Sequence, residues 1–187
     1  MGAAFDRLRP DHCQFIAAQP LFFVATAPSG DGGHLNVSPK GYDTFRVLDD
    51  TTVAYLDLTG SGAETIAHVR QNGRITIMFC SFDDKPLILR LFGQAEAIPL
   101  GDRRFEDLAP VLPQVAGARS IIRVELDRVQ TSCGYAVPHM QFVANRPKLE
   151  EWADHRGPDG LEQYWADRNS ESIDGIPALG SVRASGA

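Results

Sequence analysis

Residues 51–80 read TTVAYLDLTGSGAETIAHVRQNGRITIMFC, and the order of elements in this stretch decides the fold. Its opening residues are rich in β-formers, and the Thr-Gly-Ser-Gly run that follows breaks a strand. The Asn72-Gly73 pair is typical of a helix end. We therefore expect a strand, a glycine-rich loop, a helix and a second strand in direct succession, at residues 51–58, 59–62, 63–71 and 74–82.

The flanking sequence adds further β-structure on both sides of this stretch. Alternating or β-rich runs predict four more strands, at residues 21–26, 34–38, 87–98 and 120–130. A short helix capped by Asp11 precedes them, and residues 102–112 predict another helix. Six or so strands with one inserted helix fit a small antiparallel barrel better than repeated βαβ units. The fold class expected is mainly β with peripheral helices.

The C-terminal part has a different pattern. Residues 147–155 and 158–169 predict two helices joined by Gly157-Pro158. Beyond Gly175 the sequence is rich in Pro, Gly and Ser and predicts a poorly ordered tail, about 176–187. We expect one domain over residues 1–187, with a barrel core at about 20–130 and a helical segment at about 145–172.

Composition argues against several classes of function. The 187 residues carry a net charge of -6 with a pI near 5.3, and no basic run is interleaved with aromatics, so nucleic acid is not an expected partner. No apolar stretch approaches the ~20 residues that span a bilayer, and residues 1–10 lack a signal pattern. The three cysteines and five histidines show no metal-ligand spacing, so no metal site is expected. Reduced thiols predict a cytoplasmic protein.

The glycine-rich loop is the first candidate site. Its backbone N–H groups, at the start of a helix, favour an anion such as phosphate. Ser61 and Glu64 also have the spacing of a capping box, in which the two side chains satisfy the helix start without a ligand. Both interpretations stay open at this point.

A second candidate is the strand that contains Asn36, Ser38 and Lys40. These polar residues alternate with Leu35 and Val37, which predicts a buried apolar face and a polar face. The polar face either lines a cofactor or is simply solvated.

Two isolated residues also need an interpretation. Arg90 interrupts an apolar run, and an arginine there pairs with a carboxylate, reaches solvent or holds a ligand phosphate. Cys133 follows the last strand, where a buried packing role is favoured over redox or nucleophilic chemistry.

Taken together, LNVSPKGYDTFRVLDDTTVAYLDLTGSGAETIAHVRQNGRITIMF (residues 35–79) resembles the pyridoxamine 5′-phosphate oxidase-like family, the FMN-binding split barrels, with the likeness extending over about residues 15–130. The resemblance implies an antiparallel split barrel and a homodimer with flavin at the subunit interface. It implies flavin contacts from Asn36, Val37, Ser38, Lys40, Leu58, Thr59, Ile88 and Arg90, with Ser61 and Thr65 at the phosphate end.

The sequence departs from the family at the helix start. The oxidase usually carries a Ser-Arg-Lys-like run there, whose cations bind the FMN phosphate, whereas residues 63–65 here are Ala-Glu-Thr. The phosphate would then be held by Ser61, Thr65, the helix N–H groups and an arginine from elsewhere. The arginines considered for this role are Arg46, Arg70 and Arg90.

The resulting expectation is an FMN-dependent oxidoreductase acting on a small organic substrate, with a reduced nicotinamide as electron donor. Residues 133–142 would close over the flavin from the partner chain. Vitamin B6 oxidation is not expected, because the oxidase's C-terminal arginine motif is not recognisable. The alternatives are a deazaflavin-dependent reductase and a non-catalytic flavin- or haem-binding protein, with His34, His68 or His139 as haem ligands.

Overall fold

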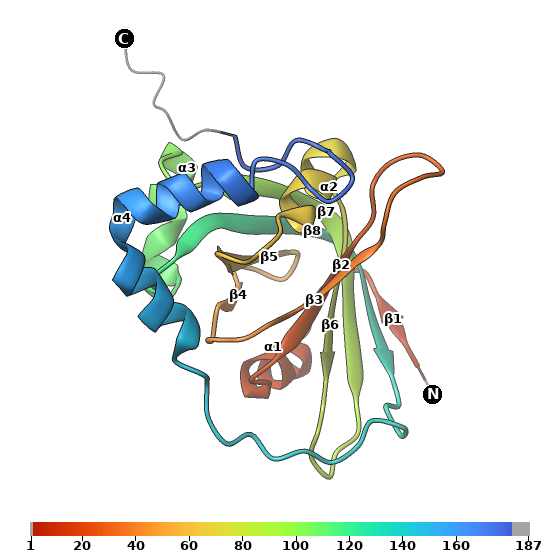
Figure 1. Cartoon of the computed structure of the whole chain (residues 1–187). Helices are drawn as coiled ribbons and strands as arrows, with labels where there is room; N and C mark the ends of the chain where they lie inside the picture. Colours follow the sequence, from red (N-terminus) through yellow and green to blue (C-terminus); the bar gives the residue numbers. More distant parts are fainter. Residues whose placement is uncertain (1, 181–187) are drawn as a thin grey trace.

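The computed structural model describes residues 2–180, which form one antiparallel sheet of eight strands surrounded by helices (Figure 1). The strand order is β3-β2-β6-β7-β8-β5-β4, and β1 pairs with β8 near its C-terminal end. The strands are β1 (Ala4–Phe5), β2 (Phe22–Thr26), β3 (Asn36–Lys40), β4 (Phe45–Val47), β5 (Thr52–Leu58), β6 (Arg74–Cys80), β7 (Ile88–Pro99) and β8 (Ala118–Ser132). This mainly antiparallel half-barrel confirms the fold class expected from the sequence.

The sheet curls. Its two end strands, β3 and β4, are consecutive in the chain, so the short connection between them brings the two edges of the sheet close together. A tight turn joins β3 to β4, and both of its central residues, Tyr42 and Asp43, have positive φ angles of 62° and 53°. Positive φ at both central positions is the signature of a type I′ turn, whose twist suits adjoining strands. Thr44 closes the turn by donating from Oγ1 to the carbonyl of Gly41 at 2.8 Å. Within the described residues no ladder joins β3 to β4, so the barrel is split there.

Aromatic and aliphatic side chains fill the inside of the curled sheet. Phe22, Phe45, Tyr55 and Phe79 are buried, with ring centroids 5.0–5.5 Å apart. Aromatic pairs at this spacing add to the energy of area burial alone. A second apolar cluster on the other face of β5 and β8 includes Leu56 and Ile121 and packs under α3 (Arg103–Leu108).

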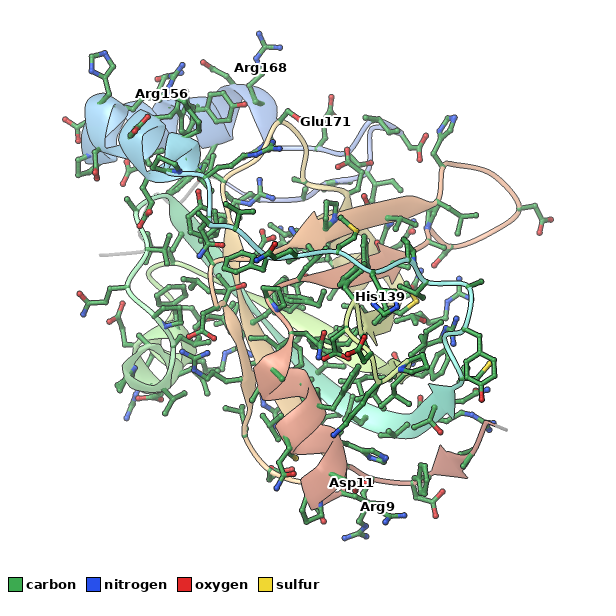
Figure 2. All side chains as sticks on the ribbon, turned by 90° about the horizontal axis from the view of Figure 1, so that it is seen from below. Arg9, Asp11, His139, Arg156, Arg168 and Glu171 are labelled. Atoms are coloured by element: carbon green, nitrogen blue, oxygen red, sulfur yellow. The ribbon has the colours of Figure 1, made fainter. Side chains whose placement is uncertain are left out.

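The remaining helices cover the edges of the sheet. They are α1 (Pro10–Ala18), α2 (Glu64–Asn72), a 3₁₀ turn at Ala109–Val111 and α4 (Lys148–Arg168). Helix α2 ends at Gly73, whose φ of 71° is left-handed, as the Asn-Gly pair predicts. Helix α4 is two helices that meet at Gly157, also as expected. Figure 2 shows Arg9 and Asp11, at the start of α1, far from Arg156 on α4. No helix in the described part combines the length and apolarity needed to cross a membrane.

Several local expectations need correction. The strand expected at residues 34–38 runs instead over Asn36–Lys40 and includes Pro39: β3 is an edge strand, where a missing N–H is tolerated, and Pro39 pairs opposite Phe23. Asp11 lies within the first turn of α1 instead of capping it, and the N–H of Arg9 donates to Nδ1 of His12. Strands β1 and β4 were not expected, because two or three residues are too short for a periodic pattern.

The C-terminal segment is more ordered than its composition suggests. Ala178 and Leu179 are buried, and their N–H groups donate to the carbonyls of Ser170 and Asn169 at 2.8 and 2.9 Å. Within the tail predicted for residues 176–187, residues 176–180 therefore have defined places. Residues 181–187 lie outside the described part of the chain.

Candidate functional site

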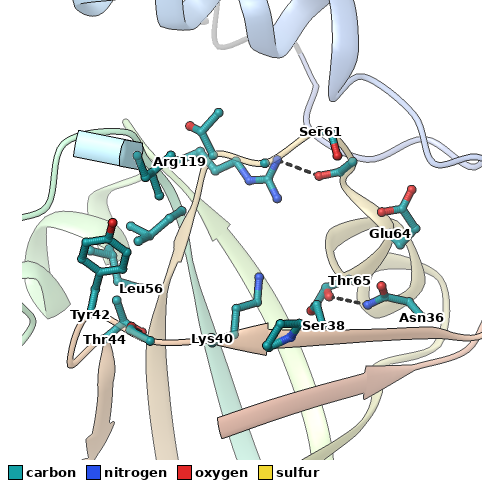
Figure 3. A pocket seen from close by; sticks show the side chains of 17 residues that line it. Asn36, Ser38, Lys40, Tyr42, Thr44, Leu56, Ser61, Glu64, Thr65 and Arg119 are labelled. Carbon is teal, nitrogen blue, oxygen red and sulfur yellow. Dashed lines mark hydrogen bonds between the residues drawn. The ribbon is translucent and has the colours of Figure 1, made fainter. Parts of the chain in front are cut away.

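A cavity of about 420 Å³ lies where β3, the end of β5 and the start of α2 meet (Figure 3). Strand β3 and its turn contribute one wall, the loop at residues 59–62 a second, and β8 contributes Arg119. The polar lining side chains are Asn36, Ser38, Lys40, Tyr42, Thr44, Thr59, Ser61, Glu64, Thr65 and Arg119. A pocket of this size with convergent polar groups is the default binding-site candidate in a small protein.

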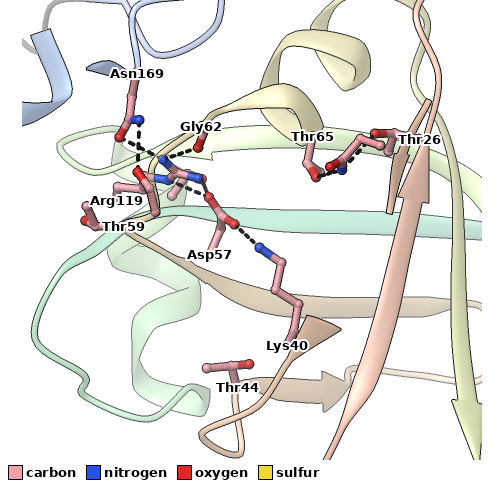
Figure 4. Close-up of polar contacts among 12 residues, drawn as sticks. Thr26, Lys40, Thr44, Asp57, Thr59, Gly62, Thr65, Arg119 and Asn169 are labelled. Carbon is pink, nitrogen blue, oxygen red and sulfur yellow. Dashed lines mark hydrogen bonds and ion pairs between the residues drawn. The ribbon is translucent and has the colours of Figure 1, made fainter. Parts of the chain in front are cut away.

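The most buried polar group behind the cavity is the carboxylate of Asp57, which holds two cations (Figure 4). Lys40 Nζ lies 2.9 Å from Oδ1, and Arg119 Nε lies 2.8 Å from Oδ2. The side chain of Asp57 is fully buried, that of Arg119 is 4% exposed and that of Lys40 is 19% exposed. Two cations on one carboxylate leave one positive charge in this corner of the cavity.

The charges of this group decide the protonation of Asp57. Burial by itself would raise the pKa of Asp57, but Arg119 and Lys40 outweigh burial and lower the pKa to about 2. Asp57 is thus ionised at neutral pH, and it orients both cations.

Two buried hydroxyl groups beside this charge cluster have no hydrogen-bond partner among the described residues. They are Oγ of Ser38, which lines the cavity, and the phenolic oxygen of Tyr55, whose ring lies 5.9 Å from Lys40 Nζ. Unsatisfied buried polar groups are rare in folded proteins, and each one calls for an explanation such as a catalytic role or a bound water or ion. Burial raises the pKa of Tyr55 well above its ordinary value, so this hydroxyl stays protonated.

The start of α2 is not a capping box, contrary to one of the two interpretations. Ala63 occupies the N-cap position, and no side chain caps the helix. Glu64 turns toward the C-terminal segment, where its Oε1 accepts from the N–H of Ile173 at 3.4 Å. The N–H groups of the first turn therefore lack a side-chain partner in the described structure.

The structure brings together seven of the ten residues singled out from the sequence. Asn36, Ser38, Lys40, Leu58, Thr59, Ser61 and Thr65 line the cavity. Asn36 also donates to Oγ1 of Thr65 at 3.0 Å, which ties β3 to α2.

The other three lie elsewhere. Val37 is on the opposite face of β3 and is 66% exposed, as is Leu35 at 80%. The apolar face of this strand, expected to be buried, is thus exposed in the single chain. Ile88 and Arg90 lie on β7 outside the cavity, and Arg90 donates to Oγ of Ser132 at 3.0 Å.

Arg119 and Asp57 were not identified from the sequence as candidate site residues. The arginines considered for phosphate have other partners: Arg46 pairs with Asp43, and Arg70 donates to the carbonyl of Ala178. Arg119 lies 62 positions from Asp57, and no local pattern links them. The only available signal for this role was the position of Arg119 directly before the strand predicted at residues 120–130. Cys133, expected to be buried, is exposed.

A mainly antiparallel half-barrel of this kind is the fold of the pyridoxamine 5′-phosphate oxidase-like split barrels. The sequence model of the Pyridoxamine 5′-phosphate oxidase family matches residues 8–133. The chain belongs to this family, as the resemblance indicated.

Known proteins agree with this assignment. The chain is 43% identical over 199 residues to the pyridoxamine 5′-phosphate oxidase family protein ustO of Aspergillus flavus, covering 97% of this chain and 80% of that protein. The fold is similar to HupZ of Group A Streptococcus, with a TM-score of 0.51 and 24% identity, covering 65% of this chain and 91% of that one. A candidate pyridoxamine 5′-phosphate oxidase of Lactobacillus delbrueckii gives a TM-score of 0.53 at 19% identity, covering 67% and 94%.

Proposed function

We propose that this protein is a flavin-dependent oxidoreductase that binds FMN in the cavity and acts on a small organic substrate. The observation that carries the proposal is the combination, in one cavity, of two cations on a buried carboxylate and the unpartnered hydroxyl of Ser38. Family membership supports the choice of a flavin.

The residues present fit the three chemical parts of FMN. A phosphate needs cations and N–H donors, and Arg119, Lys40 and the uncapped start of α2 offer them. A polyol chain needs hydroxyl and amide partners, which Asn36, Ser38 and Thr65 provide along one wall. The ring system needs an apolar surface, and Leu56 and Leu58 line the same cavity.

When bound, the flavin supplies the hydride or electron transfer. The protein's own residues bind, orient and exclude water. The ionised Asp57 orients Lys40 and Arg119, and the three side chains together keep one net positive charge. Tyr42 lies over the cavity and donates to the backbone carbonyl of Arg146, in the segment that leads into α4, which helps to shield one side from water.

A homodimer is part of this proposal. One small half-barrel does not enclose a flavin, so a second copy would complete the pocket. The exposed apolar side chains support this: Leu35 just before β3, Val37 on β3, and Tyr135, Met140, Phe142 and Val143 in the segment that follows β8. Exposed apolar surface of this kind marks interaction sites. We propose that residues 133–142 of one copy close over the flavin of the other.

The experiment is an absorption spectrum of the freshly purified protein, repeated after addition of excess FMN and desalting. Flavin bands that remain in proportion to protein support the proposal. Turnover of a reduced nicotinamide with an electron acceptor then identifies an enzyme, whereas tight binding without turnover identifies a flavin-binding protein. Absence of flavin bands after loading contradicts the FMN assignment. A deazaflavin or haem spectrum would then decide between the remaining alternatives.

A further inference from the structure

The guanidinium group of Arg119 is only partly used by the protein. Nε donates to Asp57 at 2.8 Å, and Nη1 donates to the carbonyl of Gly62 at 2.9 Å and to Oδ1 of Asn169 at 2.8 Å. Arginine has five N–H bonds, and these contacts account for three. Nη2 has no partner among the described residues, although the side chain is 96% buried by its 4% exposure and lines the cavity.

The free end of Arg119 lies beside the uncapped start of α2. Figure 3 shows the guanidinium group of Arg119 next to the glycine-rich loop near Ser61, with Lys40 lower in the view on β3, near Thr65. Helix α2 has nine residues and no side-chain cap. A buried arginine with two unused donors and a set of unpaired backbone N–H groups are both groups that bind an oxyanion.

Glu64 is the opposing charge in the lining. Its carboxylate is held toward Ile173 and against Gly62. Lys40 and Arg119 carry two positive charges, and Asp57 and Glu64 carry two negative ones, so the whole group is neutral. The charges are nevertheless separated, because Asp57 lies between the two cations (Figure 4) and Glu64 lies at the start of α2 (Figure 3). An anion therefore finds its donors at the Arg119 end.

We infer that Arg119 anchors a phosphate monoester at this end of the cavity, in place of the cations that the family carries at the helix start. The inference rests on the proposed function in that the phosphate is the terminal group of FMN. Arg119 comes from β8 instead of from α2, so this chain supplies the cation for the phosphate from a different element of the fold.

The C-terminal end of α4 positions this anchor. Asn169 is fully buried, accepts from Arg119 and donates from Nδ2 to the carbonyl of Gly60 at 3.1 Å (Figure 4). Trp165 donates from Nε1 to Oγ1 of Thr59 at 2.8 Å, and Thr59 in turn donates to the carbonyl of Gly117 at 2.6 Å. Both Trp165 and Asn169 lie beyond residues 8–133, the part that matches the family. Asn169 is thus a positioning residue that links Arg119 to the glycine-rich loop.

Calorimetric titration with FMN and with riboflavin, which lacks the phosphate, tests this inference. We expect wild-type protein to bind FMN at least about tenfold more tightly than riboflavin, because charge-assisted hydrogen bonds are lost with the phosphate. Arg119→Lys keeps the charge beside Asp57 but loses Nη2, and it should remove most of this preference. Asn169→Ala should lower FMN affinity and leave riboflavin affinity unchanged. Arg46→Lys, the same change at an arginine outside the cavity, should leave both affinities unchanged.

Each result separates the anchor from the flavin proposal. Equal wild-type affinities for FMN and riboflavin would overturn the anchor while the flavin proposal stands. Equal losses of FMN and riboflavin affinity in Asn169→Ala would reduce Asn169 to a purely structural role. If neither flavin binds, the proposed function fails, and titration with inorganic phosphate decides the anchor: binding by wild type that Arg119→Lys weakens supports it, and no binding overturns it. Should Asn169→Ala not fold, Asn169→Asp keeps the acceptor for Arg119 and removes the donor to Gly60.

Discussion

Asp57 stabilises the fold and orients the site through the same contacts. Its carboxylate is fully buried between Lys40 and Arg119. We expect Asp57→Asn to lower the free energy of unfolding at pH 7 by about 3–5 kcal/mol, because the change leaves two buried cations without their counter-charge. Urea denaturation measures the loss. Asp50→Asn, which breaks an exposed pair with Arg7, is the matched control and should have a much smaller effect.

The same variant predicts a pH dependence whose sign follows from the pKa. The folded pKa of Asp57, about 2, lies below the unfolded value of about 3.9. The contribution of Asp57 is therefore complete above about pH 3.9 and is lost as the pH falls toward about 2. Other carboxylates, including Asp102, also have lowered pKa values, so the difference between wild type and Asp57→Asn is the quantity to measure. A constant difference between pH 5 and pH 2 would contradict this assignment.

For Glu64 we predict a gain: removing its charge should strengthen the binding of FMN. Its carboxylate lines the cavity at the start of α2, where it repels a bound phosphate. Glu64→Gln keeps an acceptor for the N–H of Ile173 and removes the charge. We expect FMN affinity to rise about two- to fivefold at low salt and riboflavin affinity to stay the same. The comparison is made by calorimetry beside Glu162→Gln, an exposed change on α4, and an unchanged FMN affinity would place Glu64 away from the phosphate.

At the scale of the element, strand β3 shows what alternation does and does not reveal. The period of two correctly separates Asn36, Ser38 and Lys40 from Leu35 and Val37. The period of two does not reveal which of the two faces packs against the rest of the same chain. The polar face lines the cavity, and the apolar face is exposed, which is the reverse of the ordinary arrangement.

This reversal predicts that β3 contributes to the contact between two copies. Val37→Lys should shift the protein from dimer to monomer at micromolar concentration, because a charge replaces an apolar side chain in the interface. Light scattering coupled to size-exclusion chromatography measures the mass. Val111→Lys, at another exposed valine, is the control and should leave the mass unchanged. A dimer that persists in Val37→Lys, or a monomeric wild type, would count against the predicted contact.

The whole molecule is held together where its C-terminal segment returns to the barrel. Residues 169–179 contact the glycine-rich loop through Asn169 and α2 through Arg70. We expect the amides of Ala178 and Leu179 to exchange with deuterium much more slowly than those of the exposed turn at residues 30–33, because both donate to backbone carbonyls and their side chains are buried. Hydrogen-exchange mass spectrometry of the intact protein gives both rates. Equally fast exchange in the two segments would show that the C-terminal segment is not docked.

Local physics explains which parts of the fold were predictable. The six longer strands, the glycine-rich loop, the end of α2 at Gly73 and the break of α4 at Gly157 each depend on residues close in the chain. The candidate site was only partly predictable for the same reason. Asn36 to Lys40 and Thr59 to Thr65 form two continuous motifs, whereas the partners of Asp57 lie 17 and 62 positions away.

By itself, the sequence determined the class of fold, the family and the two motifs that line the cavity, because periodicity and turn chemistry act over a few residues. The tertiary structure alone decided that Arg119 lines the cavity beside the glycine-rich loop, that Asn169 holds it, and that the apolar face of β3 points outward. Those facts depend on how the sheet curls and where the C-terminal segment docks. Contacts between distant residues form only when the whole chain has folded, so no local pattern encodes them.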